Sequence, residues 1–381
     1  MATGKVVVPK AKKIRVGVTG SGGLIGWHVR CRLSVEADLN VSTADRTTFF
    51  TPEVMNAFVR DCDVIVHLAG RNRGSDVEIE ETNPALAKEL VEALVRTDNR
   101  PQVFFASSIH IARDTAYGRS KRKATDILSR WARQMGARFC NLVLPHVYGE
   151  HGRPFYNSVV STFCYQLATG DEPRIHVDGQ LELLHAQDVA ELILAAIRAG
   201  ASGELNPDGV PIGLSQLLAR LRGLSDKYRE GVIPEFNEPL DLRLFNTFRS
   251  YLFPEHYPVF LKLFPDDRGA SFEAVKTEHG GQAFLSTTRP GVTRGNHFHF
   301  NKVERFLVVK GEAEIRLRRC FHDTVTTFHV SGEKPCFIDI PTLHTHNIGN
   351  VGKDELLTFF WSHEICDSEY PDTYPEPVDF K

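Results

Sequence analysis

Two histidines and a glutamate lie close together in one stretch of the chain, and these residue types could bind a metal ion. His297 and His299 are separated by one residue, and Glu304 follows five positions later. In an extended strand, residues two apart project to the same face, so both imidazoles can point into the interior of a barrel. Glu304 opens an apolar run through Val309, which we expect to return antiparallel beside the histidine strand. These three side chains outline a metal site.

A second pair of histidines offers a fourth ligand. His344 and His346 repeat the same spacing downstream of Ile340 and Pro341. Three imidazole nitrogens and one carboxylate suit Zn, Fe, Ni or Mn, and ligand type alone does not choose among them. A polar barrel interior without an ion is the weaker interpretation, because four buried ionisable groups need a cation or mutual pairing to offset their desolvation.

Both stretches resemble the motifs of the cupin family. Residues 291–311 fit the pattern G-x5-H-x-H-x4-E-x6-G at every fixed position. The second stretch has Pro341, His346 and Asn350 in place but carries Leu343 where cupins usually have glycine. The resemblance implies a small β-barrel with one divalent ion, zinc being preferred. The ligands that it implies are His297, His299, Glu304 and His346.

A glycine-rich turn near the start of the chain suggests a nucleotide site. The β-branched run 14–19 leads into Gly20-Ser-Gly-Gly23-Leu-Ile-Gly26, and residues 27–33 follow as a helix. Glycine is needed there because a Cβ would hold the backbone away from a pyrophosphate at the helix N-terminus. Further strands are predicted at residues 39–43, 63–69 and 102–106, with helices such as 84–96 between them. Such alternation predicts a parallel sheet covered on both faces, with the turn at its nucleotide-binding edge.

A tyrosine, a lysine and a serine could serve the reduction of a carbonyl. Tyr117 and Lys121 are four residues apart in a predicted helix and share one face. The ammonium of Lys121 can then lower the pKa of the phenol, which gives a proton to a carbonyl that takes up hydride. Ser108, at the end of the preceding strand, can hold that carbonyl.

Together these motifs resemble the extended short-chain dehydrogenase/reductase family. They are Thr19-Gly20 to Gly26, His67-Leu-Ala-Gly70, Ser107-Ser108 and Tyr117-x3-Lys121. The resemblance implies a Rossmann-type doubly wound sheet and the catalytic residues Ser108, Tyr117 and Lys121, with Ser107 as the alternative serine. The cofactor-binding residues that it implies are Gly20, Gly23, Leu24, Ile25, Gly26, Asp45, Arg46, Leu68, Ala69, Gly70, Tyr117 and Lys121.

The residues after the second strand bear on the choice of cofactor. Asp45 would prefer the ribose 2′-hydroxyl of NAD, whereas Arg46 could pair with the 2′-phosphate of NADP. We prefer NADP(H), because a biosynthetic reduction would draw on it, and NAD(H) stays open.

The whole chain is compatible with two domains and a small-molecule substrate. Its 381 residues carry a net charge of −3, which provides no basic face for nucleic acid or anionic membranes. Seven scattered cysteines favour a reducing compartment, and no apolar run is long enough to span a membrane. We therefore expect a cytoplasmic protein. The predicted parts are a flexible leader (1–13), a dehydrogenase domain (14–250) and a metal-binding cupin domain (251–381).

This order of domains resembles CapF-type bifunctional enzymes of capsular polysaccharide synthesis. The resemblance rests on stretches that include Gly295-Asn-His-Phe-His, Thr345-His-Asn-Ile and Pro371-Asp-Thr-Tyr. It implies a homodimer acting on a UDP-linked 4-keto-6-deoxy N-acetylhexosamine, with a dTDP-sugar as the alternative. The barrel would epimerise C3 and the reductase would reduce C4 with NADPH, which gives a UDP-N-acetyl-6-deoxy-L-talosamine type product. Arg153 and Asn157 are candidate substrate ligands, and His344 and His363 are candidates for proton transfer in the barrel.

Three other functions compete with this one. The first is a nucleotide-sugar 4,6-dehydratase or 4-reductase whose cupin is structural or sensory. The second is an Fe(II) oxygenase with an open facial site. The third is an NADP(H)-sensing regulator, although Ser108, Tyr117 and Lys121 are all present.

Overall fold

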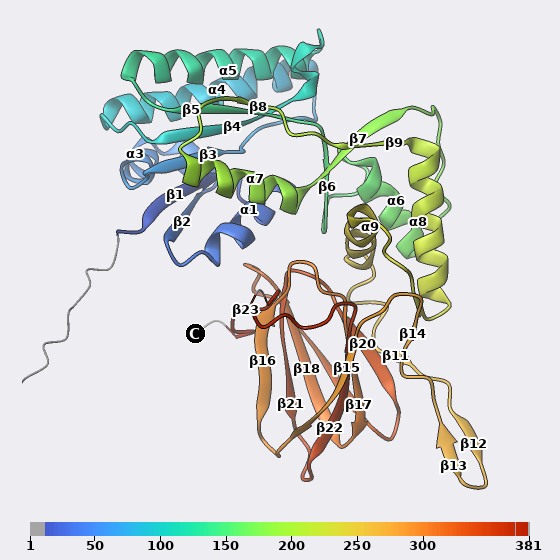
Figure 1. Ribbon diagram of the computed structural model, residues 1–381. Coiled ribbons are helices and arrows are strands. Elements are labelled where there is room, and N and C mark those ends of the chain that lie inside the picture. Colours follow the sequence, from blue (N-terminus) through green and yellow to red (C-terminus); the bar gives the residue numbers. More distant parts are fainter. Residues whose placement is uncertain (1–11, 370, 380–381) are drawn as a thin grey trace, which may run out of the picture. The chain divides into compact units, whose positions relative to one another are not determined.

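The computed structural model describes residues 12–369 and 371–379, which form two compact units (Figure 1). The first unit extends to Val147 and takes in Glu182–Gly209, and the second comprises Tyr148–Leu181 and the chain from Val210 onward. Most of the predicted leader lies outside the described residues. The domain boundary at 250/251 stays a prediction about which parts can fold alone. In the described part of the chain, no helix has the length and apolarity needed to cross a bilayer.

The first unit is a doubly wound parallel sheet, as predicted. Its six strands run in the order β2-β1-β3-β4-β5-β8. They are β1 (Ile14–Thr19), β2 (Leu39–Ala44), β3 (Val64–His67), β4 (Gln102–Ser108), β5 (Phe139–Leu144) and β8 (Gly203–Leu205). The helices are α1 (Leu24–Ser34), α2 (Arg46–Phe50), α3 (Pro52–Arg60), α4 (Asp76–Arg96), the 3-10 helix η1 (Ile109–Ala112), α5 (Ala116–Met135) and α7 (Ala186–Ala199).

Alternate residues of each strand enter different cores. In β3, Val64 and Val66 pack in a core with residues of α1 and α7, whereas Ile65 packs in a core with residues of α3, α4 and α5. Successive side chains of a strand point to opposite faces, so a continuous apolar run is required when both faces are covered. Figure 1 shows the helices on both faces of this sheet.

Helix α4 begins eight residues before the predicted start at Pro84. Ser75 caps it, because its hydroxyl accepts from Glu78 N while the Glu78 carboxylate accepts from Ser75 N. This reciprocal pair satisfies two of the free N–H groups of the first turn. Pro84 lies inside the helix, so its presence does not mark the beginning.

The second unit combines a helical part with a β-barrel. Its helices are α6 (Val159–Thr169), α8 (Leu214–Arg229) and α9 (Pro239–Arg249). Short strands in the chain around them are β6 (His146–Tyr148), β7 (Gln180–His185), β9 (Val210–Gly213), β10 (Val232–Ile233) and β14 (Lys276–Thr277).

The barrel consists of two five-stranded antiparallel sheets, in the orders β11-β20-β17-β22-β15 and β19-β18-β21-β16-β23. The first holds β11 (Val259–Phe260), β15 (Gln282–Thr288), β17 (Glu304–Lys310), β20 (Cys336–Ile340) and β22 (Leu356–Ser362). The second holds β16 (Thr293–Phe298), β18 (Glu312–Arg319), β19 (Val325–Ser331), β21 (His344–Asn350) and β23 (Tyr374–Pro375). A separate hairpin, β12 (Phe264–Asp266) with β13 (Gly269–Ser271), extends from the barrel (Figure 1).

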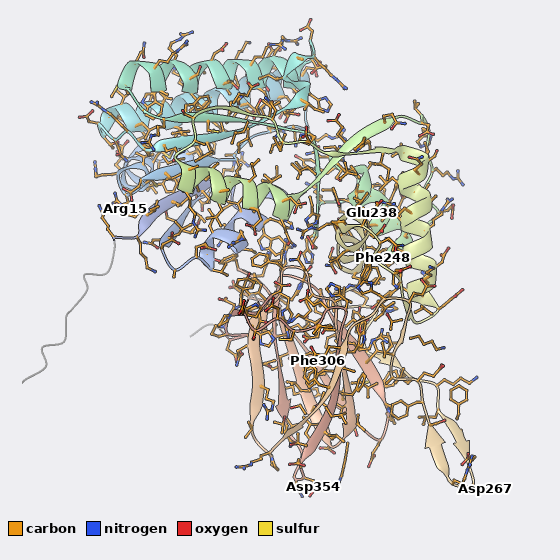
Figure 2. The ribbon with its side chains drawn as sticks, viewed as in Figure 1. Arg15, Glu238, Phe248, Asp267, Phe306 and Asp354 are labelled. Carbon is orange, nitrogen blue, oxygen red and sulfur yellow. The ribbon has the colours of Figure 1, made fainter. Side chains whose placement is uncertain are left out.

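One predicted pairing in the barrel is wrong. β17 was expected beside β16, but β16 pairs with β21 and β23, while β17 pairs with β20 and β22. The loop 299–303 thus passes from one sheet to the other. Phe306 of β17, labelled in Figure 2, packs in the barrel core with Ile315 and Phe360.

Candidate functional site

The glycine turn after β1 lies against the loop after β3. Gly20 has a φ of +67°, and a Cβ there would come within 2.6 Å of the Ala69 nitrogen. A Cβ on Gly26 would collide with the Gly20 carbonyl oxygen. Gly23 caps α1, and Leu24 and Ile25 open the helix. The backbone N–H groups at this end of α1 therefore stay accessible to a pyrophosphate.

The predicted cofactor-binding residues that follow β3 meet this turn at the carboxyl edge of the sheet. Leu68 N donates to Thr19 O (3.2 Å), and Ala69 N donates to Thr19 Oγ1 (3.2 Å). The sheet order reverses between β1 and β3, which is the point where doubly wound sheets bind nucleotides. A Cβ on Gly70 would be 2.8 Å from Asn83 Oδ1 and 3.5 Å from Lys121 Nζ, so this loop also adjoins the predicted catalytic residues.

Asn83 is a site residue that the sequence analysis missed. It is buried in α4, its amide donates to Arg71 O (2.8 Å) and Ser120 Oγ (2.8 Å), and its Oδ1 accepts from Arg71 N (2.7 Å). These bonds tie the loop after β3 to α5. A polar Asn on the buried side of an amphipathic helix was the available signal.

The structure brings the three predicted catalytic side chains together. Ser108 ends β4, and Tyr117 and Lys121 lie one turn apart at the start of α5. Ser108 lies close enough to Tyr117 for its hydroxyl to lower the pKa of the phenol. Lys121 Nζ lies 5.8 Å from the centre of the Tyr117 ring and donates to Ala106 O (2.7 Å). Ser107 Oγ is buried without a hydrogen-bond partner among the described residues, so the contact to Tyr117 favours Ser108.

Burial sets the protonation of this group. Desolvation raises the pKa of Tyr117 to about 12, although the hydrogen bond from Ser108 opposes the rise. Desolvation also lowers the pKa of Lys121 to about 8. The expected lowering of the Tyr117 pKa is wrong, because burial raises it instead. At neutral pH the phenol keeps its proton, which is the form that can donate to a carbonyl oxygen.

The side chain of Asp45 is held by hydrogen bonds within the protein, whereas Arg46 is exposed. Asp45 Oδ1 caps α2 and accepts from Thr47 Oγ1 (2.7 Å), Thr48 N (3.0 Å) and Thr48 Oγ1 (3.1 Å). The exposed Arg46 guanidinium lies 5.7 Å from the centre of the Phe50 ring. Its polar donors therefore face solvent, where a phosphate can reach them.

Arg153 and Asn157, the candidate substrate ligands, lie in the exposed loop before α6. The Arg153 guanidinium carbon lies 5.0 Å from the centre of the Tyr156 ring. This cation–π contact restrains the side chain but leaves its hydrogen-bond donors accessible.

The four predicted metal ligands converge in the barrel. Nitrogen and oxygen atoms of His297, His299, Glu304 and His346 all lie within 4.8 Å of one another. Glu304 Oε2 is 3.2 Å from His299 Nε2 and 3.3 Å from His346 Nε2. His299, Glu304 and His346 are buried, and His297 is half-buried.

The hydrogen bonds around this cluster fit a metal ion. His346 Nδ1 lies 3.1 Å from the carbonyl oxygen of His344, which can only accept, so Nδ1 carries the proton. Its Nε2 then presents a lone pair to the cluster, where that atom is buried without a hydrogen-bond partner among the described residues. Burial raises the pKa of Glu304, but the imidazoles of His299 and His346 outweigh this and hold it well below its usual range. Burial lowers the pKa of His299, but Glu304 outweighs this and raises it, so without a metal a proton lies between these two side chains. A divalent cation such as zinc would take the place of that proton between an anionic oxygen and imidazole nitrogens.

Leu343 adopts the conformation that the cupin glycine would provide. Its φ is +58°, and the side chain is fully buried. Its N donates to His299 O (2.8 Å), and its O accepts from Cys320 N (3.0 Å). The turn before His344 therefore keeps its geometry without glycine.

The two candidate proton-transfer histidines have different surroundings. His344 Nδ1 lies 3.0 Å from Thr342 O, and its ring packs edge-on against Phe253. His363 Nδ1 accepts from Val303 N (3.0 Å), the residue just before the predicted ligand Glu304. Burial lowers the pKa of His363 to about 4. Neither residue belongs to the four-residue cluster.

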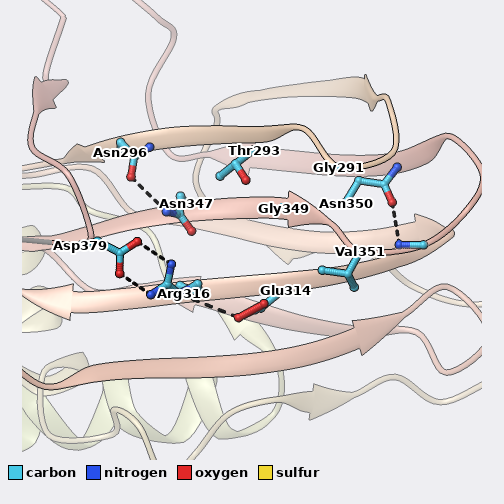
Figure 3. Close-up of a pocket in the computed structure, with 11 residues that line it drawn as sticks. Gly291, Thr293, Asn296, Glu314, Arg316, Asn347, Gly349, Asn350, Val351 and Asp379 are labelled. Atoms are coloured by element: carbon cyan, nitrogen blue, oxygen red, sulfur yellow. Dashed lines mark hydrogen bonds and ion pairs between the residues drawn. The ribbon is translucent and has the colours of Figure 1, made fainter. Parts of the chain in front are cut away.

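A pocket of about 700 Å³ lies on the outer face of β16, β18 and β21 (Figure 3). Asn347 Nδ2 donates to Asn296 Oδ1 (3.0 Å), and Arg316 pairs with Asp379 at its rim (2.8 Å). Asn347 follows the ligand His346, so the two side chains point to opposite faces of the sheet. The pocket is therefore distinct from the metal cluster.

Comparisons with known proteins cover both units. Residues 16–208 match the NAD dependent epimerase/dehydratase family, and residues 264–374 match the polysaccharide biosynthesis C-terminal domain. The chain is 30% identical over 368 residues to a UDP-2-acetamido-2,6-beta-L-arabino-hexul-4-ose reductase of Pseudomonas aeruginosa, covering 95% of this chain and 98% of that protein. The spore coat polysaccharide biosynthesis protein SpsL of Bacillus subtilis is 26% identical over 124 residues, which are 30% of this chain and 82% of that protein.

A solved structure agrees with these matches. The capsular polysaccharide assembling protein CapF of Staphylococcus aureus is similar with a TM-score of 0.62 and 30% identity, over 95% of this chain and 99% of that chain. The chain therefore belongs to the NAD dependent epimerase/dehydratase family, in the CapF-type form that carries a polysaccharide biosynthesis C-terminal domain.

Proposed function

We propose that this protein is a bifunctional nucleotide-sugar enzyme of surface polysaccharide or amino-sugar biosynthesis. The barrel epimerises C3 of a UDP-4-keto-6-deoxy-N-acetylhexosamine, and the dehydrogenase unit reduces the C4 ketone with NADPH. The product is of the UDP-N-acetyl-6-deoxy-L-talosamine type. The arrangement of Ser108, Tyr117 and Lys121 carries the proposal, and the full-length similarity to a relative named as a hexul-4-ose reductase supports it.

The dehydrogenase residues have defined tasks in the reduction. Bound NADPH supplies the hydride. The hydroxyl of Ser108 orients the C4 carbonyl, and Tyr117 donates its phenolic proton to the carbonyl oxygen. The positive charge of Lys121 favours the phenolate that remains on Tyr117. Arg46 holds the 2′-phosphate, and Arg153 and Asn157 hold the substrate, with Arg153 on its diphosphate.

The barrel residues act on the carbon beside the ketone. A neighbouring carbonyl acidifies the C3 hydrogen, so a histidine can remove that proton and another group can return it to the opposite face. We assign these transfers to His344 and His363. A divalent ion bound by His297, His299, Glu304 and His346 would either polarise the ketone or keep the barrel rigid.

Incubation with UDP- and dTDP-linked 4-keto-6-deoxy sugars in deuterated water tests both activities. We expect deuterium at C3 before any NADPH is consumed, and reduction after NADPH is added. Tyr117→Phe should lower the reduction about 100- to 10,000-fold and leave the exchange intact. His297→Ala should abolish the exchange. Absence of exchange at every carbon would remove the epimerase half of the proposal.

The same experiment separates the closest alternative. If His297→Ala leaves the stereochemistry of the product unchanged, the protein is a nucleotide-sugar 4,6-dehydratase or 4-reductase with a structural or sensing cupin. A panel with both nucleotides also identifies which one Arg153 and Asn157 accept.

A further inference from the structure

The segment 371–379, which we call the C-terminal strap, lies against β16, the strand that carries the proposed ligand His297 and ends just before His299. Its short strand β23 pairs antiparallel with β16, placing Pro375 opposite His297 and Tyr374 opposite Phe298. The Tyr374 ring stacks on Phe298 with centres 5.6 Å apart. Although the strap contains the Pro371-Asp-Thr-Tyr stretch, the proposed reaction assigns no role to it.

Asp372 of the strap holds the loop between two ligands. Its carboxylate accepts from three consecutive backbone nitrogens, Phe300 N (2.8 Å), Asn301 N (2.7 Å) and Lys302 N (2.9 Å). This loop begins after His299 and ends at Glu304. A carboxylate that collects several backbone N–H groups fixes their direction, so the spacing between the two ligands depends on Asp372.

The same residue sets the tautomer of His299. The carbonyl oxygen of Asp372 bonds His299 Nδ1, and because a carbonyl can only accept, Nδ1 must carry the proton. His299 Nε2, which hydrogen-bonds Glu304 Oε2 at 3.2 Å, is thereby directed into the cluster, where a metal that replaces the proton would find its lone pair. Outer-shell partners of this kind orient a ligating imidazole and raise its basicity.

The rest of the strap is anchored independently of the ligands. Buried Arg318 donates to Val378 O (2.7 Å) and Pro377 O (2.7 Å), and its guanidinium pairs with Glu376 (2.9 Å). Arg316 pairs with Asp379 at the exposed far end (Figure 3), and a surface ion pair of this kind adds little to the anchoring. Asp372 therefore remains in place through contacts that no metal is needed to form.

We propose that the C-terminal strap is the outer shell of the metal centre and that Asp372 is its positioning residue. The inference rests on the proposed metal site and does not require the epimerase activity. It predicts that the barrel loses its ion more readily when the carboxylate of Asp372 is removed, although all four ligands remain.

Metal retention by the full-length protein tests this inference. Wild type, Asp372→Ala, Asp372→Asn and the matched control Asp379→Asn are loaded with Zn²⁺ and titrated with a chromogenic chelator. We expect about 10- to 100-fold weaker zinc affinity for Asp372→Ala, a typical loss for an outer-shell partner. Asp372→Asn should lie between Asp372→Ala and wild type, because its amide oxygen can still accept. Asp379→Asn should match wild type.

Loading with Co²⁺ adds a readout of geometry, since its visible absorption reports the coordination. The two Asp372 variants should change that spectrum, and Asp372→Asn serves if the alanine variant does not fold. If wild type and both Asp372 variants retain zinc equally well, the inference about the strap fails and the proposed metal site stands. The same holds if Asp379→Asn loses as much zinc affinity as the Asp372 variants. If wild type binds no ion, the metal centre and the inference both fail.

Discussion

At the scale of single residues, the proposed reductase site depends on one buried ammonium. Lys121 donates to a backbone carbonyl and lies under the Tyr117 ring, in surroundings that disfavour its charge. Its pKa of about 8 lies close to physiological pH. The charge that favours the Tyr117 phenolate is therefore present below pH 8 and lost above it.

The first prediction is a pH dependence. We expect kcat/KM for NADPH to fall as the pH rises through about 8, because a neutral amine no longer stabilises charge on the phenol. The pKa of Tyr117 near 12 and that of His67 near 3 lie outside this window. Initial rates between pH 6 and 10 measure the effect. In Lys121→Met the residual activity should not fall as the pH rises through about 8. If the fall persists in this variant, another group titrates.

The second prediction concerns the choice between NADPH and NADH. Arg46→Ala should raise KM for NADPH about 10- to 100-fold, the equivalent of one lost charge-assisted hydrogen bond. KM for NADH should change little, because NADH carries no 2′-phosphate. The control is Arg60→Ala, another arginine of the same unit at the end of α3. If KM rises equally for NADPH and NADH in Arg46→Ala, Arg46 does not bind the 2′-phosphate.

At the scale of elements, the turn before β21 balances two opposing costs. A non-glycine residue with left-handed φ costs about 1–2 kcal/mol, which Leu343→Gly would relieve. Loss of a buried leucine side chain costs about 2–5 kcal/mol. Since Leu343 is fully buried, the loss of packing should win.

We therefore expect Leu343→Gly to lower the free energy of unfolding by about 1–3 kcal/mol. Urea denaturation followed by fluorescence measures it. Val351→Ala, an exposed apolar residue of the same barrel, should change stability by less than about 0.5 kcal/mol. A glycine variant more stable than wild type would show that backbone strain outweighs packing at this turn.

Local patterns predicted the elements well where local forces decide them. The run 14–19 and the glycines after it were sufficient for β1 and its turn, and the spacing of His297 and His299 placed both in one cluster. The start of α4 was missed, although Ser75 and Glu78 form a recognisable capping box. The pairing of β16 with β17 was wrong, because neighbours in sequence were assumed to be neighbours in a sheet.

Contacts between distant residues were beyond sequence reasoning. Asp372 is about 70 residues from the loop that it holds, and nothing in the spacing of the ligands points to it. Asn83 likewise acts through Arg71 and Ser120, which no motif connects with it. The fold class could be read from the sequence, whereas the contacts that orient the four clustered side chains required the structure.

At the scale of the whole molecule, a buried polar network joins the helical part of the second unit to its barrel. Arg305 and Asp339 form a buried bidentate pair at 2.7 and 2.9 Å. Tyr228 of α8 donates to Asp339 Oδ2 (2.6 Å), and its oxygen lies 2.7 Å from that of Tyr257. Arg249 of α9 donates to Ile340 O (3.2 Å). Two members of this network precede residue 251.

Tyr228→Phe should lower the free energy of unfolding by about 1–3 kcal/mol, because a buried carboxylate loses one of its donors. Tyr165→Phe in α6, half-buried, is the control and should have a smaller effect. Chemical denaturation measures both. An unchanged stability in Tyr228→Phe would mean that the Arg305 pair alone satisfies Asp339.

The network also predicts that a fragment cut at 250/251 is less stable than the intact chain.

The C-terminal strap has a consequence for the biogenesis of the protein. Its residues follow every ligand in the order of synthesis, so a nascent chain exposes His297, His299, Glu304 and His346 before Asp372 has left the ribosome. Any ion captured during that interval is held by ligands whose loop is not yet fastened. On the proposed metal site, firm metal loading is therefore a late event, which follows the docking of residue 372 against the loop after His299.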